Sequence, residues 1–230
     1  MSYFFVFDGV DGAGKSTQIK MAADFLTGMG FDVVQTREPG GTPMAEEIRG
    51  VMLSPRSEKV DPNTEMLLAY AARQQHLTER IIPELEAGKI VLCDRFSSST
   101  YAYQVCGNGA DKDLFGSLEE SIIHGIASPT GYILFDLDPE VSAQRVDSRG
   151  AKDRIEKNEE DFFERARSGY QEFFRKQESR SPGSVKMIDA NGSISEIKSL
   201  VEAGLSELLQ SSPQKRLAIK KRNDKALTMG

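Results

Sequence analysis

The chain has 230 residues, of which 39% are hydrophobic and 28% charged, and its net charge is −6. This acidic balance argues against a nucleic-acid partner, and no apolar run reaches the roughly 18 residues that cross a bilayer. The only cysteines, Cys93 and Cys106, give no sign of a disulfide framework or a metal site. Because the N-terminus enters a predicted strand directly, we expect no signal peptide and a cytoplasmic protein.

The first predicted elements are a strand, a glycine-rich loop and a helix within residues 3–20, YFFVFDGVDGAGKSTQIK. Gly9, Gly14, Lys15 and Ser16 match the spacing G-x-x-x-x-G-K-[ST] of a phosphate-binding loop. In such a loop backbone N–H groups surround a polyphosphate, the lysine reaches its β- and γ-phosphates, and the hydroxyl can bind Mg²⁺. The nucleotide-binding residues that we predict from this loop are Gly9, Val10, Asp11, Gly12, Ala13, Gly14, Lys15, Ser16 and Thr17.

The next predicted elements are a helix over 16–29 and a strand over 32–36. Arg37 and Glu38 follow this strand and precede Pro39 and two glycines. Ligands of open α/β sheets bind at the carboxyl ends of the strands, so these two charged residues are site candidates. The alternative interpretation is an ion pair on the surface.

Two helices follow, one over 43–53 that carries Arg49 and a longer one that includes residues 66–81 and carries Arg73. The apolar run KIVLCDR at 89–95 is then a predicted strand that ends in Asp94 and Arg95. An apolar strand that ends in aspartate is typical of the Walker-B pattern, with the carboxylate near the metal. Residues 96–110, rich in hydroxyls and glycine, are a predicted binding surface in which helical segments can start near Ser98.

A helix over 114–127 and a buried strand over 131–137 come next. Arg145 and Arg149 are spaced i, i+4, which places them on one helix face, and Gly150 follows them. A charged segment with a glycine hinge, over about 145–156, suits a mobile lid that closes over phosphates. The alternative is a solvated helix pair with salt bridges.

The last predicted elements are a helix over 159–176, a strand over 185–189 and a helix over 195–209. Strands alternate with helices throughout, which predicts an α/β fold with a five-stranded parallel sheet covered by helices on both faces. We expect one domain over residues 1–210. Residues 211–230 carry a net charge of +5, which leaves −11 on the rest of the chain. This composition predicts a solvated, disordered basic tail; a tail that binds anionic surfaces is the alternative.

Several segments in order resemble the thymidylate kinase family, in its bacterial type: FDGVDGAGKST, TREPGGT, YAAR, CDRFSSSTYAYQ and RGAKDRIE. The resemblance covers residues 3–209. It implies a P-loop kinase fold with a short lid, and a homodimer that uses ATP and Mg²⁺ to phosphorylate dTMP for dTTP synthesis. An acceptor phosphate is already ionised, so this reaction needs positioning and charge neutralisation rather than a base.

The resemblance also implies roles for individual residues. Lys15, Asp94, Arg95 and Arg149 match catalytic positions, with Arg145 or Arg154 as alternatives to Arg149, and Ser16 and Asp94 match metal ligands. Asp11 matches the acid that bonds the sugar 3′-hydroxyl, Arg73 the arginine that reads thymine, and Tyr103 the tyrosine that crowds the 2′ position. The full set of implied dTMP-binding residues is Asp11, Arg37, Glu38, Pro39, Arg49, Arg73, Arg95, Thr100, Tyr103 and Gln104.

One position departs from this family. Four residues before Arg73 the family usually has a phenylalanine that stacks on thymine, whereas this chain has Ala69. A lost aromatic stack costs on the order of 1–3 kcal/mol unless another side chain replaces it. Phe96, Tyr70 and Met66 are the candidates for that replacement, and a pocket for a different base is the alternative.

Two other functions fit parts of the sequence. A deoxynucleoside kinase would phosphorylate a neutral hydroxyl and needs a base, which Glu38 could supply, although the many arginines favour an acceptor that carries a phosphate. A non-catalytic nucleotide-binding module is the second alternative, but the N-K-x-D motif of guanine-nucleotide switches is absent. His76 and His124 have no metal-ligand spacing and are predicted to be structural or solvent-facing.

Overall fold

The computed structural model of the chain describes residues 2–124, 127–147 and 160–211. Five strands form one sheet, in which every strand pair is parallel and the order is β2-β3-β1-β4-β5. This confirms the predicted parallel sheet. The strands are β1 (Tyr3–Gly9), β2 (Val33–Arg37), β3 (Ile90–Asp94), β4 (Gly131–Asp136) and β5 (Val185–Asp189).

The central strands form because their residues are apolar on both faces. In β1 the four residues from Phe4 to Phe7 have no exposed surface, as expected for a strand covered on both sides. Phe7 pairs with Asp94 of β3, and Gly9 pairs with Phe135 of β4. This register brings the end of β1 level with the ends of its two neighbours, at the edge where ligands bind in such sheets.

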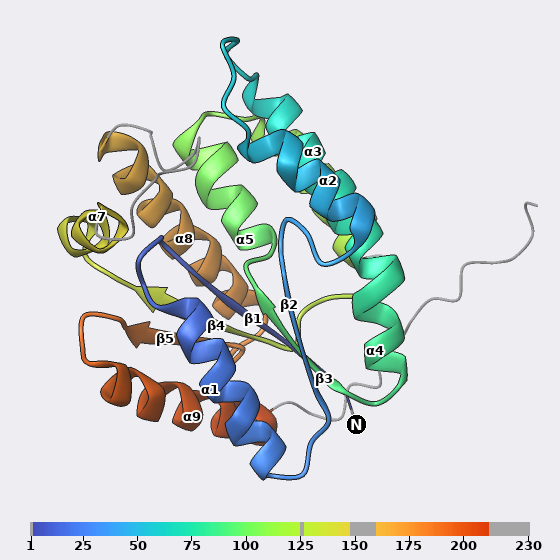
Figure 1. Cartoon of the computed structure of the whole chain (residues 1–230), viewed down its shortest axis with the longest axis vertical. Helices are drawn as coiled ribbons and strands as arrows, with labels where there is room; N and C mark the ends of the chain where they lie inside the picture. The colour runs from blue at the N-terminus through green and yellow to red at the C-terminus, as the bar shows by residue number, and fades with distance from the viewer. Residues whose placement is uncertain (1, 125–126, 148–159, 212–230) are drawn as a thin grey trace, which may run out of the picture.

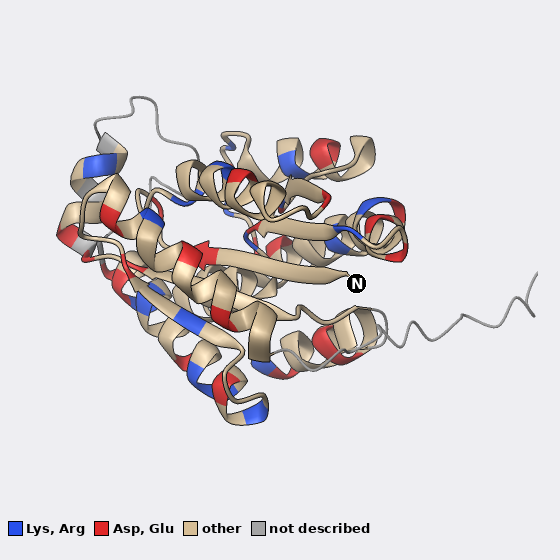
Figure 2. Ribbon diagram, turned by 90° about the horizontal axis from the view of Figure 1, so that it is seen from below, with Lys and Arg blue, Asp and Glu red and all other residues tan. Residues whose placement is uncertain are grey.

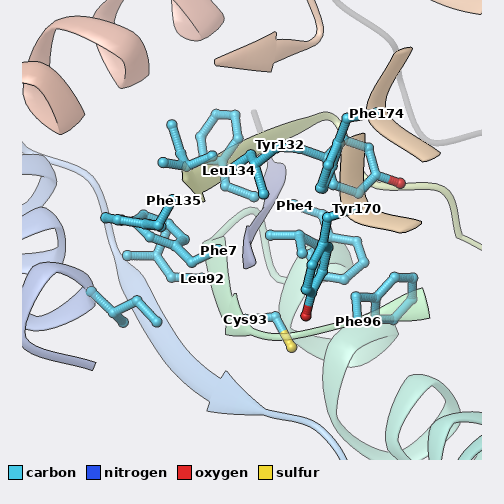
Figure 3. Packing of buried hydrophobic residues seen from close by; sticks show 14 of the residues in the cluster. Phe4, Phe7, Leu92, Cys93, Phe96, Tyr132, Leu134, Phe135, Tyr170 and Phe174 are labelled. Atoms are coloured by element: carbon cyan, nitrogen blue, oxygen red, sulfur yellow. The ribbon is translucent and has the colours of Figure 1, made fainter. Parts of the chain in front are cut away.

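Helices cover both faces of the sheet (Figure 1). On one face α1 (Lys15–Gly28) lies beside α9 (Ile194–Ser211), while α4 (Ile82–Glu86), α5 (Ser97–Thr100) and α8 (Glu160–Arg180) cover the other. Aromatic and aliphatic side chains from the strands and from α8 fill the space between the layers (Figure 3). Lysine, arginine and acidic residues are concentrated on the outer helices, and the strands between them carry few charges (Figure 2).

The predicted helix over 66–81 is longer and less regular in the structure. It comprises α3 (Pro62–His76), whose N-cap Asp61 accepts hydrogen bonds from two backbone N–H groups, and a π-helical turn, η1 (Leu77–Ile81). The α4 helix continues it directly. The shorter α2 helix (Pro43–Leu53) matches its prediction and is capped by the side chain of Thr42.

The segment 96–110 is more helical than predicted. It forms α5 and then the π-helix η2 (Tyr101–Gly107), although α5 receives no cap from its own N-cap residue, Phe96. The buried carboxylate of Asp8 on β1 accepts hydrogen bonds from the Phe96 N–H at 3.2 Å and the Ser98 hydroxyl at 2.5 Å. A distant residue therefore anchors the beginning of this helix.

Other boundaries differ by a few residues. The predicted helix over 114–127 begins earlier, as α6 (Lys112–Leu118), because Asp111 caps it, and it continues as the π-helix η3 (Glu119–His124). The α8 helix runs four residues beyond its predicted end. The α7 helix (Pro139–Asp147) carries Arg145, but Arg149, Arg154 and nearly all of the predicted lid and basic tail lie outside the described residues. Within the described residues, no helix is both long and apolar enough to cross a membrane.

Candidate active site

The phosphate-binding loop connects β1 to α1 with glycines at positions where a side chain does not fit. Gly9 has a φ of +138°, and a Cβ there would collide with the backbone oxygen of Phe135 on β4. Gly12 has a φ of +78° and lies against the backbone of Ser142. Only glycine adopts both conformations without strain, so the loop can approach β4 and α7 closely. The N-terminal end of α1, which begins at Lys15, then faces the loop and favours an anion.

Lys15 is 6% exposed, and its ammonium group turns back onto the loop. It donates to the carbonyl oxygens of Gly9 at 2.9 Å and Val10 at 2.8 Å. Burial, and then the charge of Arg95, lower the pKa of Lys15 to about 8, while nearby acids partly oppose the shift. A polyphosphate in the loop would supply the counter-charge that the buried ammonium lacks.

We expect ATP binding to be accompanied by proton uptake near pH 9, about one unit above the pKa of Lys15 in the free protein. The amine is then largely neutral before binding, and the phosphate charge raises its pKa so that it gains a proton. Calorimetric titrations in two buffers with different ionisation enthalpies measure this uptake. The variant Lys15→Met is the control and should take up none; equal heats in both buffers for the unmodified protein would contradict the prediction.

Ser16 and Asp94, the two predicted metal ligands, meet beside the loop. The Ser16 hydroxyl donates to Asp94 Oδ2 at 3.0 Å, and the second carboxylate oxygen, Oδ1, is buried with no hydrogen-bond partner among the described residues. Hydroxyl and carboxylate oxygens suit Mg²⁺, which also keeps water and phosphate ligands. Across the part of the chain that the structure describes, no cluster of three or more His, Cys, Asp or Glu side chains could hold a metal by itself. The residues present therefore fit a magnesium ion shared with phosphates.

Arg95, the residue after β3, lies between the loop and the cavity around Arg73. Its φ of +70° is unusual for a residue with a side chain and costs about 1–2 kcal/mol, which the surroundings must offset. Its guanidinium donates to Asp11 Oδ1 and to the carbonyl of Gly9, and Tyr103 donates to the other oxygen of Asp11 at 2.9 Å. The Arg95 and Asp11 side chains thus hold each other at the boundary of the two cavities.

The cavity around Arg73 contains a buried ion pair. Arg73 Nε donates to Glu38 Oε2 at 2.7 Å, and the other oxygen, Oε1, is 3.1 Å from His76 Nδ1. Arg73 NH2 donates to Thr100 at 3.0 Å, whereas its NH1 is buried with no partner among the described residues. Burial lowers the pKa of Arg73, but the charge and hydrogen bond of Glu38, together with the charges of Tyr70 and Glu119, outweigh burial and leave the pKa above its usual value. Arg73 is therefore a fixed cation with one N–H group available for a ligand.

Ala69 lines the same cavity, at the position where the family resemblance leads one to expect a phenylalanine ring. Of the three replacement candidates, Phe96 lines the cavity, whereas Tyr70 and Met66 are buried elsewhere in the core. The guanidinium of Arg73 lies 4.5 Å from the ring centroid of Tyr70 and 5.0 Å from that of Phe96. These rings therefore support Arg73, and Phe96 is the only one of the three candidates that lines the cavity.

Most of the predicted site residues surround these two adjoining cavities. The cavity around Arg73 measures about 120 Å³, and the cavity along the phosphate-binding loop about 480 Å³. Val10 and Ala13 instead place their side chains in the core, and Arg149 is outside the described residues. The first cavity is lined by Asp11, Glu38, Pro39, Arg49, Arg73, Arg95, Thr100, Tyr103 and Gln104. The second is lined by Asp11, Gly12, Gly14, Lys15, Ser16, Thr17, Arg37, Glu38, Arg49, Asp94, Arg95 and Arg145.

The sequence pattern missed several residues of the site. His76 is structural, as predicted, but it also bonds Glu38, and its other ring nitrogen is 2.6 Å from the hydroxyl of Thr36. Asp8 and Tyr170 were not singled out by any motif, yet both reach the group around Arg95. The sequence holds one signal for Asp8, which is an acid inside an otherwise apolar strand.

The parallel sheet, the loop between β1 and α1, and Asp94 at the end of the neighbouring strand together define a P-loop nucleotide-binding enzyme. A sequence model of the family described as thymidylate kinase matches residues 7–201. The chain belongs to the thymidylate kinase family, and it is accordingly an ATP-dependent nucleoside monophosphate kinase.

Individual relatives support this assignment over almost their full length. The chain is 41% identical over 209 residues to the thymidylate kinase of Pseudomonas fluorescens strain Pf0-1, covering 91% of this chain and 97% of the relative. It is 42% identical over 199 residues to that of Caulobacter vibrioides, covering 86% and 93%. The solved thymidylate kinase of Ehrlichia chaffeensis superposes with a TM-score of 0.67 at 30% identity, covering 89% of this chain and 98% of that one.

Proposed function

We propose that this chain transfers the γ-phosphoryl group of ATP to dTMP, giving dTDP and ADP for dTTP synthesis, with the residue roles given below. The observation that carries the proposal is the junction of the two cavities. Asp11, Glu38, Arg49 and Arg95 line both of them, so a nucleotide in the first cavity would present its phosphate to the loop in the second.

The phosphate groups meet a set of fixed positive charges. Lys15 neutralises the β- and γ-phosphates, and Arg95 and Arg37 hold the acceptor phosphate, whose oxygen is already ionised. Ser16 and Asp94 would hold Mg²⁺, which supplies further charge neutralisation when bound. Among the lid arginines, we assign Arg149 to the transferring group. Catalysis then consists of alignment and electrostatic stabilisation.

The nucleoside of the acceptor occupies the cavity around Arg73. The free N–H of Arg73 NH1 suits a carbonyl oxygen of thymine, and Thr100 and Gln104 lie beside it. Gln104 is itself oriented by donating to Glu65 at 2.6 Å. Following the family resemblance, Asp11 bonds the 3′-hydroxyl and Tyr103 crowds the 2′ position. The hydrogen bond from Tyr103 to Asp11 supports both roles because it holds the two side chains together.

We further propose a cytoplasmic homodimer built from a single domain of residues 1–210, with a lid over about 145–156 and a dispensable tail over 211–230. The family resemblance supports the dimer, and the net charge of +5 supports a solvated tail. Besides the second copy of the chain, the proposed partners are the small-molecule substrates ATP and dTMP, with no nucleic acid and no membrane.

The structure disfavours the alternative of a deoxynucleoside kinase. Glu38 was the candidate base for that reaction, but both of its carboxylate oxygens are engaged, one by Arg73 and one by His76. A carboxylate that is 3% exposed and ion-paired is poorly suited to take a proton from a hydroxyl.

A coupled ADP-release assay with ATP and Mg²⁺ tests the proposal, with dTMP, dUMP, dCMP, dGMP and thymidine as parallel acceptors. We expect dTMP and dUMP, whose pyrimidine rings both carry a C4 carbonyl for the free N–H group of Arg73, to react faster than dCMP and dGMP. Of these two, dTMP should have the higher kcat/KM, because its 5-methyl group adds apolar contact. Comparable rates for several monophosphates would retain the kinase and remove the thymine specificity. Activity with thymidine alone would instead establish the deoxynucleoside kinase.

A further inference from the structure

Tyr170 is a buried tyrosine of α8 whose ring and hydroxyl have different surroundings. The side chain is 1% exposed, its ring is stacked parallel to Phe174 with centroids 6.3 Å apart, and it meets Tyr103 edge-on at 6.0 Å. Figure 3 shows the ring among the core aromatics, with its oxygen at the end that points away from Phe174. The ring therefore belongs to the core, and the hydroxyl leaves the core toward the site.

The hydroxyl of Tyr170 is one link in a chain of hydrogen bonds. It lies 3.0 Å from Arg95 NH1 and 2.6 Å from the hydroxyl of Ser99, which in turn lies 2.6 Å from Asp8 Oδ1. A guanidinium only donates and a carboxylate only accepts. The protons are therefore ordered, with Arg95 donating to Tyr170, Tyr170 to Ser99, and Ser99 to Asp8.

This order connects the buried charge of Asp8 to the cation at the phosphate site. Asp8 has no exposed surface and is held by the N–H groups of Gly9 and Phe96, so its position is fixed by β1 and α5. Burial, and then the charge of Asp8, raise the pKa of Tyr170 well above its usual value, so the hydroxyl keeps the proton that it donates to Ser99. Hydrogen bonds in such a chain polarise one another.

We propose that Tyr170 is a positioning residue for phosphoryl transfer, because its hydroxyl, anchored through Ser99 to Asp8, fixes the Arg95 guanidinium at the acceptor phosphate. The inference rests on the function proposed above for Arg95. Asp11 holds NH2 of this guanidinium, while Gly9, Ser99 and Tyr170 hold NH1. Of these groups Tyr170 alone comes from α8, so this contact makes the position of Arg95 depend on how α8 packs.

The variant Tyr170→Phe tests the proposal because it keeps the ring and removes only the hydroxyl. We expect kcat/KM for dTMP to fall about ten-fold, the effect of losing one hydrogen bond to a charged group, while KM for ATP stays within about two-fold. Tyr132→Phe is the matched control. Tyr132 is also buried and packs edge-on against Phe174 of α8 at 5.3 Å, but it is not among the groups bonded to Arg95. Its kinetic constants should stay within about two-fold of the unmodified enzyme.

A double-mutant cycle separates positioning from simple stability. In an Arg95→Lys background, which lacks the planar NH1 and NH2 groups, Tyr170→Phe should cause less than about a two-fold further loss. The same ten-fold loss in both backgrounds, or a lower melting temperature with unchanged kinetic constants, would overturn the proposal. If Arg95→Lys itself left dTMP phosphorylation unchanged, the assigned role of Arg95 would fail as well. If Arg95→Lys lowered kcat/KM for dTMP but Tyr170→Phe left it unchanged, only the role of Tyr170 would be overturned.

Discussion

Replacing Lys15 with methionine is expected to lower kcat for dTMP phosphorylation by about 10²- to 10³-fold, the loss typical of removing one preorganised donor to the transition state. Methionine keeps the unbranched side chain and removes the charge. In the free enzyme the ammonium bonds only the carbonyls of Gly9 and Val10 among the described contacts, so its full electrostatic value is realised when phosphates replace them. The effect should fall on kcat more than on KM for dTMP, because the acceptor site is in the other cavity.

The same substitution should leave stability nearly unchanged. The lowered pKa of Lys15 indicates that folding disfavours its charged form. The substitution removes this unfavourable buried charge, which offsets the loss of the two hydrogen bonds that the ammonium group makes. Thermal melts of the variant should therefore resemble those of the unmodified protein. Lys20→Met, on the exposed side of the same helix, is the control and should leave both kcat and melting temperature unchanged. A Lys15→Met enzyme with more than about one tenth of the original kcat would contradict the assigned role.

The sequence allowed the elements with strictly local causes to be predicted. The phosphate-binding loop follows from fixed spacing within a few residues, and the strand at Val185–Asp189 has exactly its predicted bounds. The end of β3 was also predictable, because Asp94 and Arg95 follow a run that is apolar on both faces. Parallel strands bring such ends to one edge, which is why the candidate residues on separate strands lie together.

The parts of the site that escaped prediction depend on contacts between distant residues. Asp8 anchors the beginning of the α5 helix from about 90 positions away, and the N-cap residue of that helix, Phe96, supplies no side-chain cap. His76 meets Glu38 across 38 positions, and no spacing rule within one helix or strand relates them. Tyr170 looks like any core aromatic of an amphipathic helix. Tertiary packing alone gives these residues their roles.

Replacing Glu38 with alanine is expected to lower the free energy of unfolding by about 3–5 kcal/mol, because it leaves the Arg73 guanidinium buried without its counter-ion. Arg73 is 2% exposed and cannot turn to water without opening the cavity. For a protein of this size the loss corresponds to a fall in melting temperature of about 6–20 °C. KM for dTMP should rise as well, because Arg73 loses the partner that orients it. Glu202→Gln, which removes a partly exposed i, i+4 pair with Lys198, is the control and should cost less than about 0.5 kcal/mol.

A double variant distinguishes the unpaired charge from a mere loss of packing. If the cost comes from the unpaired guanidinium, Glu38→Leu combined with Arg73→Met should be much more stable than Glu38→Leu alone and should recover most of the stability lost in Glu38→Ala, because neither member of the buried pair remains charged. The recovered protein should still bind dTMP poorly, since the N–H group proposed to read thymine is gone with Arg73. A double variant as unstable as Glu38→Ala would show that packing dominates. One that regained dTMP affinity would remove Arg73 from base recognition, so chemical denaturation and dTMP titration of the same sample test both claims.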